Sequence, residues 1–215
     1  MAIVQNPLIG RASGKFSGAV FSTNYSKNVI RSRPVEFRDK KSASQLAQRS
    51  KFIIAQQWVV KFLTIIRTGF ASLAVNKSAY IAALSWYLEN GITGSPGSYE
   101  IDYTNAKFTF GDLAQIAGAN IDYFNTDFIS IDVDDNSNLD NASADDIGIL
   151  ILYDPLSDII YTSSTANFRT SGILEGANIP FSHGTECHIW FYAQSSSGNS
   201  ISESQYYGFY ECTQS

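Results

Sequence analysis

Cys187 and His188 are the residues that come nearest to a nucleophile beside a general base. The chain contains two histidines, and the second directly follows a cysteine. Residues 188–193 are mostly apolar and typical of a β-strand, in which neighbouring side chains point to opposite faces. A nucleophile and its base need a hydrogen-bond contact. We therefore expect no Cys/His catalytic pair.

The segment from Asp132 to Asp140 has the spacing that comes nearest to a metal site. Its Asp-x-Asp-x-Asn opening fits a calcium-binding loop. However, Ser137 stands where that loop requires glycine, and Ser143 stands where it requires a bidentate glutamate. We interpret the segment as an acidic loop between two strands, and we expect no metal and no other cofactor.

Phosphate binding and acid/base catalysis also lack the necessary spacing. Gly10 to Phe16 superficially resembles a phosphate-binding loop, but three rather than four residues separate its glycines. Phe16 stands where serine or threonine would bind magnesium. No pair of carboxylates stands out from the other acidic residues as a glycosidase pair would. We therefore expect a protein that is not an enzyme.

Basic residues are concentrated at the start of the chain. Residues 1–67 contain twelve Lys or Arg and two acidic residues, whereas residues 68–215 contain three and eighteen, so charges of +10 and −15 make up the total of −5. This division predicts either an anionic partner such as nucleic acid, or pairing between the basic part of one subunit and the acidic part of another. The candidate nucleic-acid contacts are Arg11, Lys15, Lys27, Arg31, Arg33, Lys40 and Lys41.

A long helix is predicted from Lys41 to Arg67. Ser42 and Gln45 form a capping-box start, and from Trp58 to Ile66 only a lysine and a threonine interrupt the apolar residues. A helix that is apolar on all sides must be covered on more than one side. We expect a neighbouring copy to supply part of this cover, through an oligomer interface made of Arg31, Arg33, Trp58, Val59, Phe62, Leu63, Ile65 and Ile66.

The segments around this helix predict the rest of the fold. Residues 10–34 are typical of a β-hairpin with its turn at 24–27, and a second helix is expected from Ser78 to Glu89. From Tyr99 onward, short apolar runs separated by Asn, Asp, Ser and Gly indicate an antiparallel immunoglobulin-like sandwich. The predicted fold class is α+β: a basic β-hairpin plus two helices in residues 1–93, a linker at 94–98, and an immunoglobulin-like β-sandwich in 99–215.

The sequence also gives expectations about location. A bridge between Cys187 and Cys212 is geometrically possible if the last two strands pair, but we expect two reduced thiols, as is usual inside cells. The first residues lack the pattern of a signal peptide, and no apolar run approaches the ~20 residues of a membrane span. We expect a soluble protein made in a bacterial cytoplasm, with a virion as its further expected location and no membrane partner.

Several motifs resemble those of a known family. They are NPLIGRASGKFSGAVFS at 6–22, KNVIRSRP at 27–34 and SASQLAQRSKF at 42–52, and the similarity continues through Asp146, Tyr153 and Arg169 to the 204–207 stretch. On these residues the chain resembles a family of uncharacterised Bacteroidota and phage-associated proteins that form a domain of unknown function. Where its members often have Trp-Lys-Gly-Lys in the hairpin turn, this chain has Asn-Tyr-Ser-Lys. The resemblance implies no reaction and no catalytic residue, and it favours a virion-structural protein.

Three hypotheses about function remain open at this point. The first is a self-assembling structural protein of a phage or virus-like particle, a homo-oligomer that also contacts other particle proteins, with Arg31 and Arg33 facing acidic loops such as 132–140 or 145–146. The second is a nucleic-acid-binding module that uses the basic amino-terminal face. The third is a carbohydrate- or surface-binding protein that uses the loops of the sandwich.

Overall fold

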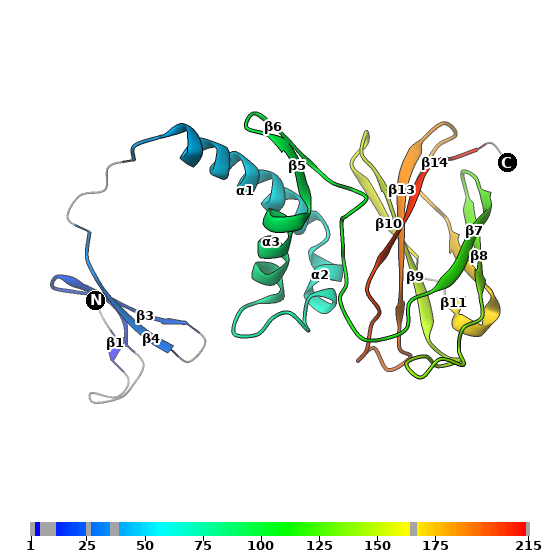
Figure 1. Ribbon diagram of the computed structural model, residues 1–215, viewed down its shortest axis with the longest axis horizontal. Helices are drawn as coiled ribbons and strands as arrows, with labels where there is room; N and C mark the ends of the chain where they lie inside the picture. Colours follow the sequence, from blue (N-terminus) through cyan, green and yellow to red (C-terminus); the bar gives the residue numbers. More distant parts are fainter. Residues whose placement is uncertain (1–2, 5–11, 25–26, 35–38, 164–166, 214–215) are drawn as a thin grey trace. The chain divides into compact units, whose positions relative to one another are not determined.

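The computed structural model describes residues 3–4, 12–24, 27–34, 39–163 and 167–213 (Figure 1). The chain divides into two compact units, residues 1–46 and residues 47–215. Helices and antiparallel sheets together make an α+β fold that is mostly β-structure, so the predicted fold class is confirmed. None of the described helices is long and apolar enough to cross a membrane.

The first unit contains an antiparallel sheet. Its four strands run in chain order across the sheet and are β1 (Ile3–Val4), β2 (Ala12–Phe16), β3 (Ala19–Asn24) and β4 (Lys27–Ser32). β3 and β4 form the predicted hairpin, in which Asn24 is paired with Lys27. A second two-residue turn, with Ser17 at φ 50°, connects β2 to β3. The hairpin is therefore part of a larger sheet than expected.

Three helices follow: α1 (Ala43–Lys61), α2 (Leu63–Gly69) and α3 (Ala79–Asn90). The predicted capping box is confirmed, since the Ser42 backbone N–H donates to Gln45 Oε1 and the Gln45 N–H donates to Ser42 Oγ. Ser78 caps α3 by accepting a hydrogen bond from the backbone of Ile81. The predicted helix 41–67 is broken at Phe62, whose φ of −101° and ψ of 22° separate α1 from α2.

The carboxyl-terminal part of the chain forms two antiparallel sheets (Figure 1). One sheet has the order β10-β9-β13-β14, with β11 also paired to β9, and the other has the order β12-β8-β7. Their bounds are β7 (Ala117–Phe124), β8 (Phe128–Asp134), β9 (Ile147–Asp154), β10 (Ile159–Thr162), β11 (Asn167–Phe168), β12 (Ile173–Ala177), β13 (Glu186–Gln194) and β14 (Gln205–Glu211). Two packed antiparallel sheets, here of three and five strands, are the arrangement of an immunoglobulin-like sandwich.

Strands β9 and β13 are buried on both faces. Leu152 and Ile189 point into the core between the two sheets. Their chain neighbours Ile151, Tyr153 and Trp190 point the other way and belong to a second core, on the opposite face of the same sheet. Alternating side chains of one strand point to opposite faces, so the central strands of this sheet contribute to both cores.

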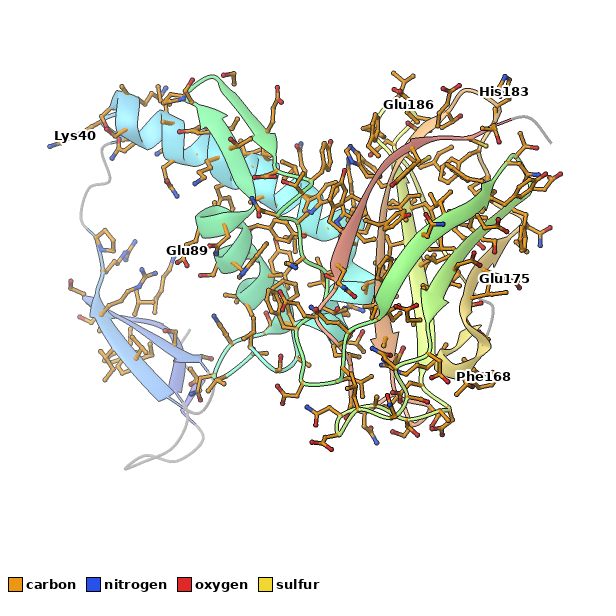
Figure 2. All side chains as sticks on the ribbon, turned by 45° about the vertical axis from the view of Figure 1, so that its right-hand side comes forward. Lys40, Glu89, Phe168, Glu175, His183 and Glu186 are labelled. Atoms are coloured by element: carbon orange, nitrogen blue, oxygen red, sulfur yellow. The ribbon has the colours of Figure 1, made fainter. Side chains whose placement is uncertain are left out.

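The second core is completed by the helices. Three aromatic or aliphatic side chains of the first two helices pack there with Tyr87 of α3. They are Trp58 of α1, Phe62 at the break between α1 and α2, and Ile66 of α2. Figure 2 shows side chains filling the space between these helices and the sheet. Lys61 at the end of α1 also forms an ion pair with Asp158 in the β9–β10 turn. The helices and the sandwich therefore share one compact unit.

The expected linker at 94–98 has a regular structure. It forms the turn of a two-stranded hairpin, β5 (Ile92–Ser95) and β6 (Ser98–Ile101), in which both glycines adopt positive φ. The compact units meet at Leu46 and Ala47 instead. The expected division into 1–93 and 99–215 separates the helices from the sandwich. In the structure they pack together, because the outer face of the β9–β13 sheet is apolar and the helices cover it.

Candidate functional site

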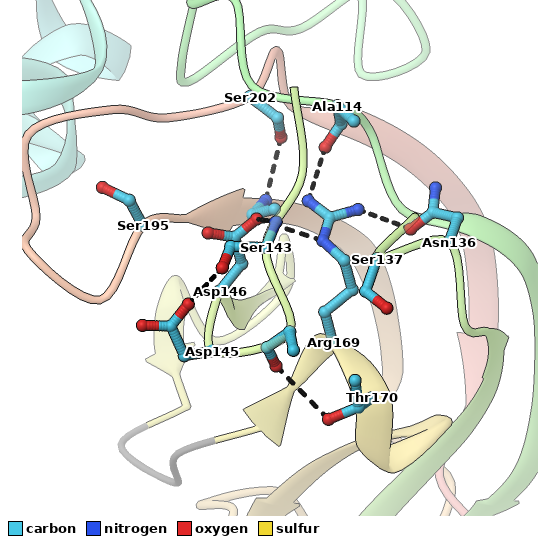
Figure 3. Close-up of polar contacts among 12 residues, drawn as sticks. Ala114, Asn136, Ser137, Ser143, Asp145, Asp146, Arg169, Thr170, Ser195 and Ser202 are labelled. Atoms are coloured by element: carbon cyan, nitrogen blue, oxygen red, sulfur yellow. Dashed lines mark hydrogen bonds and ion pairs between the residues drawn. The ribbon is translucent and has the colours of Figure 1, made fainter. Parts of the chain in front are cut away.

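A buried ion pair lies at one end of the sandwich, between Arg169 after β11 and Asp146 before β9 (Figure 3). Arg169 Nε lies 3.2 Å from Asp146 Oδ2, and the two side chains are only 3% and 2% exposed. The guanidinium also donates to the carbonyl of Ala114 and to the side chain of Asn136. The Asp146 carboxylate accepts a second hydrogen bond, from the Ser143 backbone. Nearly every polar group of the pair is thus satisfied.

This arrangement connects three loops that are far apart in the sequence. Residues 112–115, 134–146 and 167–171 all meet at the Arg169 guanidinium. On the same loop, Asp145 accepts a hydrogen bond of 2.6 Å from Ser196 at the β13–β14 hairpin. Hydrogen bonds from Ser143 and Ser196 lower the pKa of Asp145. We interpret the cluster as a structural brace that holds the loop end of the sandwich.

A concave feature of the described residues lies beside this brace. It is a half-open cavity of about 650 Å³. One wall is the end of α2 and the turn after it, with Arg67, Thr68, Ala71 and Ser72. The other walls are residues 110–113, Asn141 and the hairpin tip 198–201. Small-molecule sites in proteins typically occupy roughly 300–1,000 Å³, so this cavity is a candidate binding site.

Four of the predicted interface residues lie in the core of their own chain. Trp58, Val59, Phe62 and Ile66 are at most 3% exposed. The sheet face formed by β9 and β13, together with α3, covers them. Leu63 and Ile65 are half-buried. Because the chain itself buries this apolar segment, a neighbouring copy is not needed to cover it.

The predicted basic contacts lie in the first unit, where the register separates two faces of the sheet. Lys15, Val20 and Arg31 are direct cross-strand neighbours and share one face. Lys15, Arg31 and Arg33 are exposed, as are Lys40 (Figure 2) and Lys41 in the segment that follows. Lys27 lies in β4, and Arg11 lies outside the described residues.

The opposite face of the same sheet carries an apolar patch. Phe16, Ala19, Phe21 and Ile30 lie on it by register. Phe16 is 68% exposed and Ile30 is 65% exposed. Within the described residues, a basic face and a partly exposed apolar face therefore lie back to back on a small sheet.

Cys187 and His188 point to opposite faces, as predicted. Cys187 lies in the core of the sandwich, where burial raises the pKa of its thiol to about 12. His188 stacks on Tyr103, with ring centroids 4.0 Å apart, and burial lowers its pKa to about 4. Cys212 is also a free, buried thiol. The Cys187 thiol and the His188 imidazole therefore cannot act on each other as nucleophile and base.

The acidic segment 132–140 has structural contacts. Asn136 donates to the Gln115 carbonyl and accepts from Arg169, and the Ser137 backbone donates to Asp135. In the part of the chain that the structure describes, no three His, Cys, Asp or Glu side chains converge as metal ligands would. Asp146, proposed above as a partner for the arginines of another copy, is buried against Arg169 and is not accessible to them.

These features define a class: an α+β protein with an immunoglobulin-like sandwich, a helical layer on one sheet and a separate basic sheet. The family of unknown function DUF6266 matches residues 11–208, so the chain belongs to that family. A search among curated proteins finds no match.

Among solved structures, a myokine structure has 9% identity and a TM-score of 0.35, covering 48% of this chain and 100% of its own. The fibronectin type III domain of the human collagen α-1(XX) chain has 10% identity and a TM-score of 0.35, covering 48% of this chain and 88% of its own.

Proposed function

We propose that this protein is a non-enzymatic assembly protein, in which the amino-terminal sheet of one copy docks onto another copy. The observation that supports this most is the two-faced sheet of β1 to β4. A small sheet becomes stable by burying a hydrophobic face or by packing against another element. Phe16 and Ile30 are largely exposed within the described residues. Covering each such side chain contributes about 1.5–3 kcal/mol, which favours docking.

The charge of the two units favours a second copy as the partner. Residues 1–46 contain eight basic and two acidic residues, a net charge of +6. Residues 47–215 contain seven basic and eighteen acidic residues, a net charge of −11, and the two values give the total of −5. Charge complementarity of this kind steers association and sets its register. Acidic residues exposed on the sandwich, such as Asp122, Asp132 and Asp140, offer the complementary surface.

Such a contact joins unlike surfaces, and heterologous contacts generate rings or filaments rather than simple dimers. The expected setting, a phage or virus-like particle of Bacteroidota, rests on the motif resemblance. Negative-stain electron microscopy of the purified protein tests whether closed or filamentous assemblies form. Static light scattering of the full chain over a range of protein concentrations tests the proposal itself: a molar mass that rises with concentration supports it, and a constant monomer mass contradicts it.

Nucleic acid is the second candidate partner, favoured by the exposed Lys15, Arg31 and Arg33. Binding through such residues neutralises phosphates and weakens steeply as salt is added. The ultraviolet absorbance ratio of the purified protein, before and after nuclease, measures any bound nucleic acid. Assemblies that persist after nuclease support protein–protein docking, and assemblies that dissolve support the nucleic-acid function.

A further inference from the structure

We propose that the cavity beside α2 binds a small saccharide, of one or two sugar units. The cavity lies wholly within the compact unit 47–215, so this proposal is independent of how the amino-terminal sheet docks. Its volume of about 650 Å³ is in the usual range for a small-molecule site.

Hydrogen bonds connect the walls of the cavity to one another. Ser72 Oγ donates to the Phe110 carbonyl at 2.8 Å, and the Phe110 N–H donates to the Gly69 carbonyl at 2.8 Å. The Leu113 N–H donates to the Ile201 carbonyl at 3.1 Å. A Cβ at Gly111 would lie 2.1 Å from that same carbonyl oxygen, so only glycine allows this close approach. The walls are thus pre-organised, and a ligand does not have to order them.

The loop walls are tied to the sandwich as well. Asn141 Nδ2 donates to the Asp112 carbonyl at 3.0 Å, and the Ala114 N–H donates back to the Asn141 carbonyl at 2.8 Å. Arg169 in turn holds Ala114. The Arg169–Asp146 pair therefore fixes the position of the loop that forms one wall of the cavity.

The polar side chains of the cavity indicate the kind of ligand. Arg67 and Asp112 are exposed, and no other described residue forms a hydrogen bond or an ion pair with either side chain. Together they give the cavity no net charge. An anion would meet the Asp112 carboxylate, and a cation would meet the Arg67 guanidinium.

A ligand rich in hydroxyl groups matches both side chains. Each hydroxyl has one donor and two acceptor positions, so neighbouring hydroxyls can accept from a guanidinium and donate to a carboxylate. The amide of Asn199 at the hairpin tip adds both a donor and an acceptor. Phe110, Leu113 and Ile201 supply apolar surface for the C–H face of a sugar ring. This mixture of donors, acceptors and apolar surface distinguishes a saccharide from an ionic ligand.

Ligand-observed saturation-transfer NMR on the full chain tests the proposal. The probes are glucose, galactose, mannose, N-acetylglucosamine and their common disaccharides, each at millimolar concentration, with alanine as a zwitterionic probe. We expect saturation transfer to at least one saccharide and none to alanine. Transfer to alanine alone, or to no saccharide of this panel, overturns the proposal.

Variants then assign the site. Arg67→Gln and Asp112→Asn each remove a charged hydrogen-bond partner, and such bonds contribute about 1.5–3 kcal/mol, so each variant is expected to bind at least about tenfold more weakly. Glu89→Gln, which removes an exposed carboxylate on α3 outside the cavity, is the matched control and is expected to bind normally. Both cavity side chains are exposed, so circular dichroism should show an unchanged fold. Unweakened binding by the two cavity variants contradicts the assignment.

Discussion

Trp58 on α1 and Trp190 on β13 lie with ring centroids 6.5 Å apart and ring planes 59° apart. Trp58 also lies 5.1 Å from the ring of Tyr153, and Trp190 lies 5.2 Å from the ring of Phe108. Aromatic pairs at such separations stabilise beyond the area that they bury. This relationship connects the helices to the outer face of the sheet, and we expect the two to unfold together.

Val59 and Val60 offer a matched test of which side of α1 is core. Val59 is fully buried, whereas its neighbour Val60 is 51% exposed. Val59→Ala should lower the free energy of unfolding by about 2 kcal/mol, because it removes buried methyl groups and leaves a cavity. Val60→Ala should change it by less than about 0.5 kcal/mol. Urea denaturation of the full chain measures both, and equal effects would show that α1 is not buried as described.

Removing the helices should expose the outer face of the sandwich. A fragment of residues 98–215 leaves Trp190, Tyr153 and Tyr192 without the helices that cover them. We expect this fragment to aggregate or to lose fixed tertiary structure, whereas a fragment of residues 47–215 should stay folded as a compact unit. Near-ultraviolet circular dichroism compares the two. A well-folded, monomeric 98–215 fragment would mean that the helices are dispensable.

The Arg169–Asp146 pair should be costly to break and cheap to replace. Removing one partner leaves a buried charge unpaired, so Asp146→Ala should destabilise the chain by about 3–5 kcal/mol. The double variant Arg169→Met with Asp146→Leu removes both charges and should recover much of this loss. Denaturant unfolding of the single and double variants gives the comparison. A double variant as unstable as the single one would mean that the carbonyl contacts of Arg169, not its charge, stabilise the loops.

His188 should make stability depend on pH. Burial lowers its pKa from 6.5 to about 4, so between these two values the unfolded chain binds a proton that the folded chain does not. The free energy of unfolding should therefore fall as pH falls from 6.5 toward 4, and the contribution of His188 should be constant above 6.5.

His188→Gln should reduce that slope, whereas His183→Gln, at the exposed histidine, should not. Thermal unfolding at several pH values measures the difference between each variant and the natural chain. Equal slopes for all three proteins would show that His188 is not held neutral by burial.

The sequence predicts many elements of the fold well. The apolar runs at 128–132, 147–153, 159–162 and 188–193 lie within β8, β9, β10 and β13. The capping box of Ser42 and Gln45 is also present as predicted. β7 was not predicted because Gly118, Asn120 and Asp122 have low strand propensity, and its register with β8 is irregular. Residues 107–110, which also include apolar side chains, form no strand and are held by Ser204 and Ser202.

The pairing of helices and sandwich was missed although the sequence contains a signal for it. The runs at 147–153 and 187–193 are nearly continuous in apolar residues, a pattern typical of strands buried on both faces rather than one. The cavity and the Arg169–Asp146 pair gave no comparable signal. Their residues come from segments up to 134 positions apart in the numbering, from Arg67 to Ile201, and only the folded chain brings them together.

The central claim, that the amino-terminal sheet joins copies, is tested most directly by charge reversal on its basic side. The full chain carrying Arg31→Glu and Arg33→Glu is compared with a chain carrying Lys51→Glu and Lys77→Glu, which changes the same charge outside that sheet. The measurement is molar mass by size exclusion with light scattering, after nuclease treatment. We predict that the control keeps the mass of the natural protein and that the sheet variant falls toward the monomer of 23.6 kDa. Equal masses for the sheet variant, the control and the natural protein would contradict assembly through the sheet.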